Sequence, residues 1–240
     1  MRLGIMQPYF FPYPGYFDLI LKSDRWVVFD IVKFQKKSWM SRNRILDVNK
    51  GETYIGVPVR KGEPDLILNA EVIDPRLAAE KMRRQLGAYR SHAPNFAEVE
   101  AMVGSIFETF LDGAPTINRL NVLGLEAVCA KLGISFDWEL ASNLDLDFSS
   151  VNHAGQWALE ICDQLGANAY INPPGGRDIF RAEEWDARGI EISFTRPPQL
   201  TYSVMGKFSF LPDLSILDAL MWLPGGAIKE HLLALPADPI

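Results

Sequence analysis

Asp30 and His92 are the titratable side chains in this chain that are best suited to moving a proton during a reaction. Transfer of an acyl group to an amine needs a base beside the amine and hydrogen-bond donors for the developing oxyanion. Asp30 is the preferred base or amine anchor, with a surface turn as its alternative role, and His92 is the second candidate. Asn43, or the backbone amides of Gly175 and Gly176, are the candidate oxyanion donors.

A basic stretch lies beside Asp30. Residues 22–50 contain eight Lys or Arg against three Asp, an excess of five positive charges. Arg42 and Arg44 can each bind a phosphate through a guanidinium fork, and Lys36 or Lys37 adds a point charge. A nucleotide-linked sugar or a phosphopantetheine arm would supply such an anion. We expect an anion site here, the alternative being a solvated basic loop.

Residues 5–18 form an aromatic loop that cannot be an ordinary helix or strand. The stretch has six aromatic residues, three prolines and one glycine, and each proline fixes φ and removes an amide donor. Tyr9 and Tyr16 present flat apolar faces with hydroxyls at their tips, beside the polar Gln7. Two interpretations stand: a rigid wall of a ligand site, or a proline-stiffened core plug.

Residues 172–178, Asn-Pro-Pro-Gly-Gly-Arg-Asp, form a second informative loop before a predicted helix. Glycines before a helix allow close backbone approach, and free amides there favour an anion. The pattern matches neither a phosphate-binding P-loop nor a dinucleotide fingerprint, so a turn without a ligand is the alternative.

Near the C-terminus, Ser215 and Asp218 are three residues apart in a predicted helix over residues 212–223 and share one face. If that face lines the cleft, Asp218 can orient an incoming amine, whereas a capping or solvent-facing role is the alternative. Tyr202 lies in the polar connection before this helix.

The elements that position these residues alternate between strands and helices. Strands are expected over residues 2–6, 25–30, 53–59, 67–73, 135–140, 167–171 and 190–194, with 53–59 and 67–73 as a hairpin. Helices are expected over 16–22, from Pro75 to about Arg90, over 96–111 and 116–132, from an Asn152 cap to Gly166, and up to Gly189. The pattern predicts an α/β fold with an open, mainly parallel sheet flanked by helices and a helical insertion around 75–132.

Composition favours one domain over residues 1–240, with sub-lobes 1–132 and 133–240 as a further division. No signal peptide or membrane-spanning run is visible, so we expect a cytoplasmic protein without stable membrane insertion. Cys129 and Cys162 are expected to be buried thiols, and the spacing of the histidines predicts no metal site. A net charge of −6 argues against DNA binding.

Two N-terminal blocks carry a resemblance to a known family. Residues 5–18 contain Gln-Pro-Tyr and Gly-Tyr-Phe, and residues 30–45 combine an aspartate, a Phe and a Trp with Arg-Asn-Arg-Ile. Later pieces follow in order: Val-Pro-Val at 57–59, Tyr-x-x-x-Ala-Pro-x-Phe at 89–96, Ser-Asn at 142–143, Leu-Gly-Ala-x-x-Tyr at 165–170 and Leu-Ser-Ile-Leu-Asp at 214–218. The chain thus resembles the WbqC-like protein family over nearly its whole length.

That resemblance implies a role in bacterial O-antigen or other lipopolysaccharide and surface-polysaccharide biosynthesis. The implied activity is transfer of glycine or another aminoacyl group onto an amino sugar. One departure is the Asn-Pro-Pro-Gly-Gly run after Tyr170, where the family has Ser-Gly, which predicts a different ligand or acceptor.

We therefore expect a transferase that moves an aminoacyl or acyl group onto the amine of a nucleotide-linked amino sugar. No cofactor is identified; the donor is an activated group carried by an acyl carrier protein, by aminoacyl-tRNA or by a small thioester. The predicted substrate-binding residues are Gln7, Tyr9, Tyr16, Lys36, Trp39, Arg42, Asn43, Arg44, Asn172, Gly175, Gly176, Arg177, Tyr202, Ser215 and Asp218. Nucleotidyl or adenylyl transfer, and non-catalytic binding of a precursor, are the alternatives.

Overall fold

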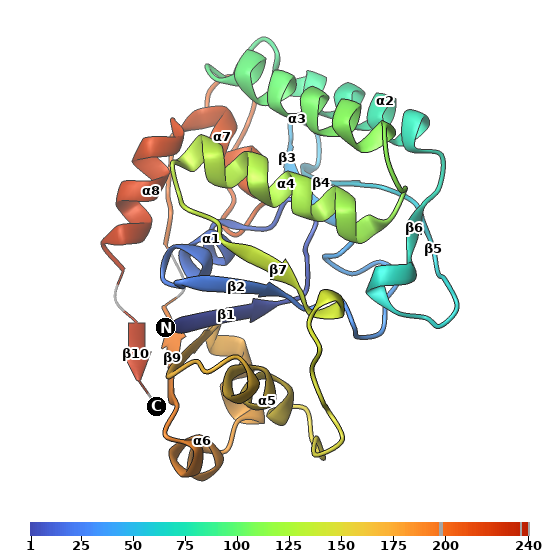
Figure 1. Ribbon diagram of the computed structural model, residues 1–240. Helices are drawn as coiled ribbons and strands as arrows, with labels where there is room; N and C mark the ends of the chain where they lie inside the picture. The colour runs from blue at the N-terminus through green and yellow to red at the C-terminus, as the bar shows by residue number, and fades with distance from the viewer. Residues whose placement is uncertain (197–198, 236, 240) are drawn as a thin grey trace.

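Short apolar runs from both halves of the chain form one central sheet, which the computed structural model shows in Figure 1. The structure describes residues 1–196, 199–235 and 237–239. The strands of this sheet are β1 Arg2–Met6, β2 Arg25–Val28, β7 Trp138–Leu140, β8 Ala169–Asn172, β9 Glu191–Thr195 and β10 Ala237–Pro239. They lie in the order β10-β9-β8-β1-β2-β7, all parallel except β10, which is antiparallel to β9. The predicted open, mainly parallel sheet is confirmed.

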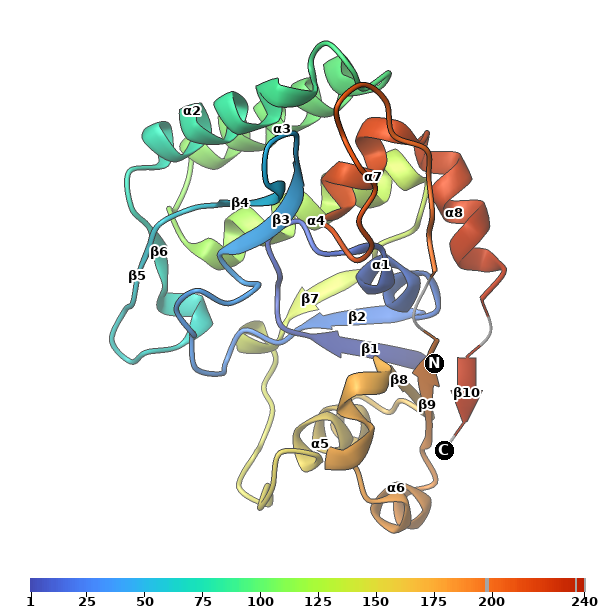
Figure 2. The same cartoon turned by 180° about the vertical axis from the view of Figure 1, so that it is seen from behind.

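The helices cover both faces of this sheet (Figures 1 and 2). Their bounds are α1 Pro14–Leu21, α2 Pro75–Leu86, α3 Phe96–Leu111, α4 Ile117–Leu132, α5 Gln156–Gln164, α6 Ala182–Arg188, α7 Ile216–Trp222 and α8 Gly225–Leu233. Helices α5 and α6 lie below the sheet in Figure 1, and the others lie above it.

Alternation along the strands gives each face its own core. Trp26 and Val28 of β2 belong to the large core under α1, α4, α7 and α8, whereas Val27 belongs to the smaller core against α5 and α6. Cys129 and Cys162 are both buried and unpaired, as expected, and burial raises the pKa of the Cys129 thiol to about 12.

The helical insertion around 75–132 consists of α2, α3 and α4. Asp74 caps α2, because its Oδ1 accepts a hydrogen bond from the Leu77 amide at 3.1 Å, and Pro75 occupies the first helical position. Thr116 caps α4 in the same way through the Arg119 amide. Helix α2 ends at Leu86, and a 3-10 turn, η2 Gly87–Tyr89, continues it toward Arg90.

The predicted hairpin of residues 53–59 and 67–73 was wrong for most of the first strand, because β4 pairs with β3 instead. Strands β3 Arg42–Asp47 and β4 Gly51–Gly56 form the main hairpin, although the sequence predicts no strand over residues 42–47. The short strands β5 Val59–Arg60 and β6 Glu71–Val72 do pair antiparallel. A 3-10 turn, η1 Ile67–Asn69, replaces the first half of the expected second strand.

Two helix starts also differ from prediction. Asn152 does not cap α5, which begins at Gln156 after Gly155; instead the Asn152 amide donates to Gln156 Oε1 at 2.8 Å. Helix α7 begins at Ile216, because the Ser215 hydroxyl accepts the Leu217 amide and so acts as its N-cap. Ser215 therefore has the capping role that the sequence left open.

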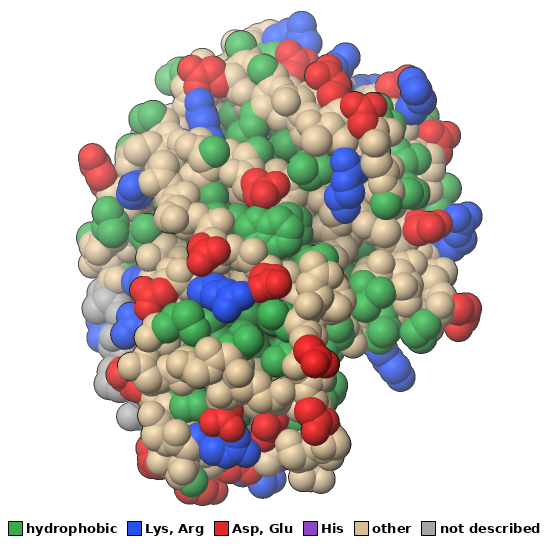
Figure 3. All heavy atoms as spheres, viewed as in Figure 1, with side chains coloured by type: hydrophobic (Ala, Val, Ile, Leu, Met, Phe, Trp, Pro, Cys, Tyr) green, Lys and Arg blue, Asp and Glu red, His purple; other side chains and the backbone are tan. Residues whose placement is uncertain are grey.

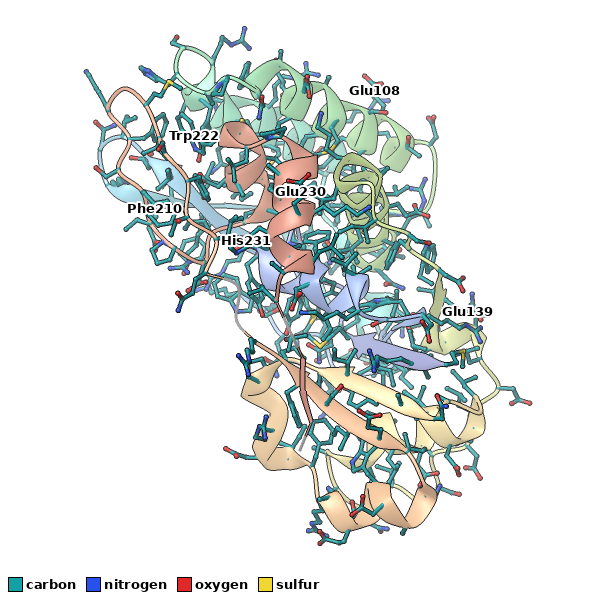
Figure 4. All side chains as sticks on the ribbon, turned by 90° about the vertical axis from the view of Figure 1, so that its left-hand side faces the viewer. Glu108, Glu139, Phe210, Trp222, Glu230 and His231 are labelled. Carbon is teal, nitrogen blue, oxygen red and sulfur yellow. The ribbon has the colours of Figure 1, made fainter. Side chains whose placement is uncertain are left out.

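Helix α8 packs along α1 at one end of the sheet. Figure 4 shows Glu230 and His231 on α8, Trp222 at the end of α7, and Phe210 in the long loop that precedes α7.

The strands on either side of residue 132 share one sheet, since β1 and β2 lie between β7 and β8. The division into sub-lobes stays a prediction.

Acidic and basic side chains are interspersed over the face seen in Figure 3. Within the described ranges, no helix combines the length and apolar character needed to cross a bilayer.

Candidate functional site

The parallel strands β1, β2, β7 and β8 all have their carboxyl ends at one edge of the sheet, and open α/β sheets place ligands at such edges. Asp30 lies two residues after β2, as predicted. Its side chain is fully buried. Asp30 Oδ1 accepts the Ser142 amide at 3.0 Å, and Oδ2 accepts the Ser142 hydroxyl at 2.7 Å and Asn118 Nδ2 at 3.0 Å.

Both oxygens of Asp30 therefore already have donors, which join the end of β2 to the turn after β7 and to helix α4. Charge-assisted hydrogen bonds of this kind hold loops firmly in place. The arrangement supports Asp30 as a residue that positions this edge, and its predicted role as a base stays a prediction.

Two asparagines of α4 reach the same region and were not predicted. Asn121 Nδ2 donates to the carbonyl oxygens of Pro8 and Met40, both at 2.8 Å, and so ties the aromatic loop to the segment after Asp30. Asn118 and Asn121 are nearly fully buried. An i, i+3 pair of asparagines within the predicted helix over residues 116–132 was the available signal.

The aromatic loop is pinned from several sides. Asn43 Nδ2 donates to the Phe11 carbonyl at 2.8 Å, and the Ser215 hydroxyl donates to the same oxygen at 2.7 Å. Phe11 itself has a left-handed backbone with φ of 41°. Asn43 and Ser215 therefore have a structural role, because their side chains hold the aromatic loop at Phe11.

Most of the aromatic loop is core. Phe10, Phe11, Tyr16 and Phe17 are buried in the large core, whereas Tyr9 is half-buried. Burial raises the pKa of Tyr16 well above its ordinary value, and its hydroxyl donates to the Gln7 carbonyl at 2.8 Å. The core-plug interpretation describes this stretch better than the ligand-wall interpretation.

A cleft of about 530 Å³ opens between the β3–β4 hairpin and α2. In Figure 2 these elements lie on the same side of the molecule as the loops that leave the carboxyl ends of β1 and β2. We call it the basic cleft; it is lined by Lys36, Lys37, Arg42 and Lys81, by the apolar Phe34, Ile55, Val57, Pro58, Val59, Ile73, Leu77 and Ala78, and by Ser41, Tyr54, Gly56 and Asp74.

The four cations of the basic cleft come from three separate elements: Lys36 and Lys37 from the loop after β2, Arg42 from β3 and Lys81 from α2. Among the described residues, none of the four forms an ion pair with a carboxylate. The guanidinium of Arg42 lies over the ring of Tyr54, 4.3 Å from its centre. Four cations gathered beside one lining carboxylate, Asp74, favour an anionic ligand.

Arg44 and Trp39 do not line this cleft. Arg44 Nη1 pairs with Glu52 at 3.0 Å, and Arg44 Nη2 donates to the Asp213 carbonyl at 3.4 Å. The Arg44 guanidinium also lies 5.7 Å from the ring centre of Trp39. Of these two predicted phosphate-binding arginines, the structure therefore places Arg42 in the cleft and Arg44 outside it.

Asp218 is fully buried and faces three donors rather than a cleft. Its Oδ1 accepts the Leu46 amide at 3.0 Å and the Tyr89 hydroxyl, and its Oδ2 accepts the Tyr202 hydroxyl at 2.5 Å. Desolvation raises the pKa of Asp218, and the donated hydrogen bonds oppose that shift. The same burial, with the nearby carboxylate, raises the pKa values of both tyrosines, so they remain donors.

His92 lies at the far end of α2, beyond η2. Its ring packs against Phe208 at 5.7 Å between centres, and its Nδ1 lies 2.4 Å from where a Cβ on Gly206 would be. Within the described ranges, the ring and hydrogen-bond partners of His92 are different residues from those of Asp30. The two candidate bases therefore belong to different parts of the molecule.

The loop after β8 forms a 3-10 turn, η4 Pro174–Ile179, and α6 begins only at Ala182. The Asn172 side chain is occupied locally: its Oδ1 accepts the Tyr170 hydroxyl at 2.8 Å and its Nδ2 donates to the Pro173 carbonyl at 3.0 Å. The Gly176 amide donates to that same carbonyl at 3.2 Å. Gly175 and Arg177 are exposed, and the Arg177 guanidinium lies 4.4 Å from the ring centre of Phe194.

Sequence reasoning found part of the basic cleft. It placed Lys36, Lys37 and Arg42 in one anion site but missed Lys81 and Tyr54. The basic segment did contain most of the cations, whereas Lys81 is brought to it only by the packing of α2 on β4.

Comparison with known proteins places the chain in a family. An uncharacterized protein of Mycobacterium tuberculosis (strain ATCC 25618 / H37Rv), Rv1507c, is 29% identical over 233 residues, which cover 96% of this chain and 97% of that protein. No solved structure matches the chain. The model of the WbqC-like protein family matches residues 7–230. Together with the two N-terminal motifs, this match shows that the chain belongs to the WbqC-like protein family.

Proposed function

We propose that this chain is a transferase that moves an aminoacyl or other acyl group onto the amine of a nucleotide-activated amino sugar in surface-polysaccharide biosynthesis. The observation that carries the proposal is the basic cleft, because four cations that have no carboxylate ion-pair partner within the described part of the chain favour a phosphate-bearing substrate. Activated sugars and most activated acyl donors carry phosphates. The family resemblance supplies the reaction class.

The position of the cleft supports the same proposal. Ser41 and Phe34 line it, and both belong to the segment that follows Asp30. That segment is bound to the aromatic loop, because the Phe10 amide donates to the Trp39 carbonyl at 2.8 Å. A ligand in the cleft therefore lies against the stretch in which the family motifs are concentrated.

In the proposed reaction the amine nitrogen attacks the acyl carbon and forms a C–N bond. The bond from that carbon to the leaving group breaks, and the leaving group departs with the electron pair. The amine loses one proton, which the leaving group takes up. The cations hold substrate phosphates in place, and binding two substrates together lowers the entropic cost of this step.

The experiment incubates the purified protein with a panel of nucleotide-linked amino sugars and three classes of donor: an acyl thioester, aminoacyl-tRNA, and ATP with a free amino acid. Mass spectrometry detects an N-acylated sugar nucleotide, which is the expected product. Binding of a sugar nucleotide without product from any donor would instead indicate a precursor-binding protein. Release of pyrophosphate from ATP with a nucleotidylated product would indicate nucleotidyl transfer.

A further inference from the structure

The walls of the basic cleft are unusual for a sugar-binding site. Sugars and nucleobases are held through many directional hydrogen bonds, which need amide, hydroxyl and carboxylate side chains. Between its cations, the cleft is lined mainly by aliphatic side chains such as Val57, Val59 and Leu77. Its uncharged polar side chains are Ser41, which is nearly buried, and Tyr54, whose ring lies under Arg42.

The one carboxylate that lines the cleft is already engaged. Asp74 caps α2 through the Leu77 amide. It is therefore held at the helix N-terminus instead of reaching across the cleft to neutralise Lys81 or Arg42. The four lining cations and the apolar side chains remain the dominant features of the site.

The backbone around the cleft is held in a costly conformation at two positions. Lys37 and Asp74 both line the cleft, and both have left-handed backbones, with φ of 58° and 47°. This region is unfavourable for a residue whose side chain has a Cβ. Such strain at two lining residues fits a loop and a helix start that are shaped around a ligand.

The size of the cleft restricts the ligand. A volume of about 530 Å³ lies in the range of pockets for single small molecules, roughly 300 to 1,000 Å³. One phosphorylated arm of moderate length fits this space. A long polyprenyl chain would need a much longer apolar surface.

We infer that the basic cleft binds a phosphate that is attached to a flexible arm of short aliphatic segments joined by amides, as in the phosphopantetheine of coenzyme A or of an acyl carrier protein. This inference rests on the proposed function and makes the cleft the donor site. The cations bind the phosphate, and the aliphatic wall binds the arm. The sugar nucleotide then binds outside the cleft.

The donor is accordingly a thioester. The amine nitrogen attacks the thioester carbonyl carbon, a C–N bond forms, and the C–S bond breaks. Sulfur leaves with the electron pair and takes up the proton that the amine loses. The products are an amide on the sugar and a free pantetheine thiol, and no oxidant or reductant is needed.

The test measures the binding of 4′-phosphopantetheine, coenzyme A and inorganic pyrophosphate by calorimetry. Lys81→Ala is compared with Arg83→Ala, which removes the same charge from the same helix but on its α3 side. We expect Lys81→Ala to weaken 4′-phosphopantetheine and coenzyme A by about tenfold or more, the loss of one charged hydrogen bond, and Arg83→Ala to leave them near the wild-type value.

A wall variant separates the arm from the phosphate. Leu77 lines the cleft and is 58% exposed, so Leu77→Gln should fold, as circular dichroism can verify. We expect Leu77→Gln to weaken 4′-phosphopantetheine several-fold and to leave pyrophosphate unchanged, because only the apolar contact is lost.

Three results would overturn the inference: no binding of 4′-phosphopantetheine, binding that is equally sensitive to Lys81→Ala and Arg83→Ala, or displacement of coenzyme A by a sugar nucleotide competing for the same cleft. A preference for an isoprenyl phosphate over 4′-phosphopantetheine would also overturn it.

The inference and the proposed function fail separately. Cleft-dependent binding of 4′-phosphopantetheine without any acylation of amino sugars would support the donor site and contradict the proposed acceptor. Acylation of a sugar nucleotide at the wild-type rate by Lys81→Ala and Leu77→Gln would support the transferase and contradict the donor site.

Discussion

Asp30 and the cations of the basic cleft are ionisable side chains in opposite situations: Asp30 is buried among hydrogen-bond donors, whereas the cations line an open cleft. Asp30 is buried and accepts three hydrogen bonds, from the Ser142 amide, the Ser142 hydroxyl and Asn118. The cations line the cleft, and the described part of the chain offers them no carboxylate ion-pair partner. Both regions belong to, or directly contact, the segment that the family motif marks.

The contrast separates positioning from binding. A buried carboxylate whose two oxygens both accept hydrogen bonds stabilises the loops that supply the donors. Its removal leaves those donors without an acceptor. A solvated cation without a partner contributes little to the fold and remains available to a ligand. Substitutions in the first region should therefore change stability, and substitutions in the second should change affinity.

The largest expected effect is on stability, from Asp30→Ala. The change leaves the Ser142 amide, the Ser142 hydroxyl and Asn118 Nδ2 without their acceptor in a buried site. The free energy of unfolding should fall by about 3 kcal/mol or more, since hydrogen bonds to a charged group contribute about 1.5 to 3 kcal/mol each. Urea unfolding followed by circular dichroism measures the loss.

Ser142→Ala is the matched control, because it removes one donor and leaves the carboxylate with two. Its loss should be clearly smaller than that of Asp30→Ala. If Asp30→Ala unfolds at the wild-type urea concentration but loses transferase activity, Asp30 acts in the chemistry and the contrast drawn here is wrong.

The next effect is on affinity, from Arg42→Ala. Removing a guanidinium that binds a phosphate should weaken an anionic ligand by about 1.5 to 3 kcal/mol, while the fold is retained. Arg44→Ala, on the same strand, should have little effect, because Arg44 is paired with Glu52 outside the cleft. Calorimetric titration with coenzyme A or pyrophosphate distinguishes the two variants. Equal losses of affinity in both variants would mean that the phosphate contacts Arg44 as well as Arg42 and therefore lies outside the cleft.

Much of the fold followed from the sequence, because several elements have strong local signals. Asp74-Pro75 marked the start of α2, and the 3.6-residue spacing of apolar residues gave the bounds of α3 and nearly those of α4. The strand over residues 2–6 was also correct, since a short apolar run before a proline-rich loop has few alternatives.

The β3–β4 hairpin was missed because residues 42–44 carry charge and an amide where an apolar alternation is expected. Arg42 and Arg44 lie on one face of β3, and Asn43 faces inward, where its amide binds the aromatic loop. A buried polar residue that serves a tertiary contact breaks the strand pattern.

The candidate site followed from the sequence only where its residues are close together in the chain. Lys36 and Arg42 were predicted as one anion site and do line one cleft, whereas Lys81 joins them only through tertiary packing. Asp218 showed the opposite problem. Its spacing from Ser215 indicated a polar face, but local periodicity could not tell that this face points into the core, toward Tyr89 and Tyr202.

The smallest expected effect comes from Asp218, and it tests whether this second saturated carboxylate behaves as a buried group. Desolvation raises the pKa of Asp218 above 3.8 in the folded state. A carboxyl with a raised folded-state pKa contributes stability that is fully present below its unfolded pKa and is lost as the pH rises through the folded pKa. The wild type should therefore lose stability relative to Asp218→Asn as the pH increases from about 4, by at most about 1.4 kcal/mol per pH unit.

Urea unfolding of both proteins at a series of pH values between 4 and 7 measures this difference, and subtracting the variant removes the contributions of the other titrating groups. Tyr202→Phe is the companion variant, because it removes one donor that stabilises the carboxylate and should move the loss to higher pH. If the stability of the wild type relative to Asp218→Asn instead stays constant or increases with pH, the three donors outweigh desolvation. Asp218 would then be held as a carboxylate by its partners, and burial alone would not set its charge.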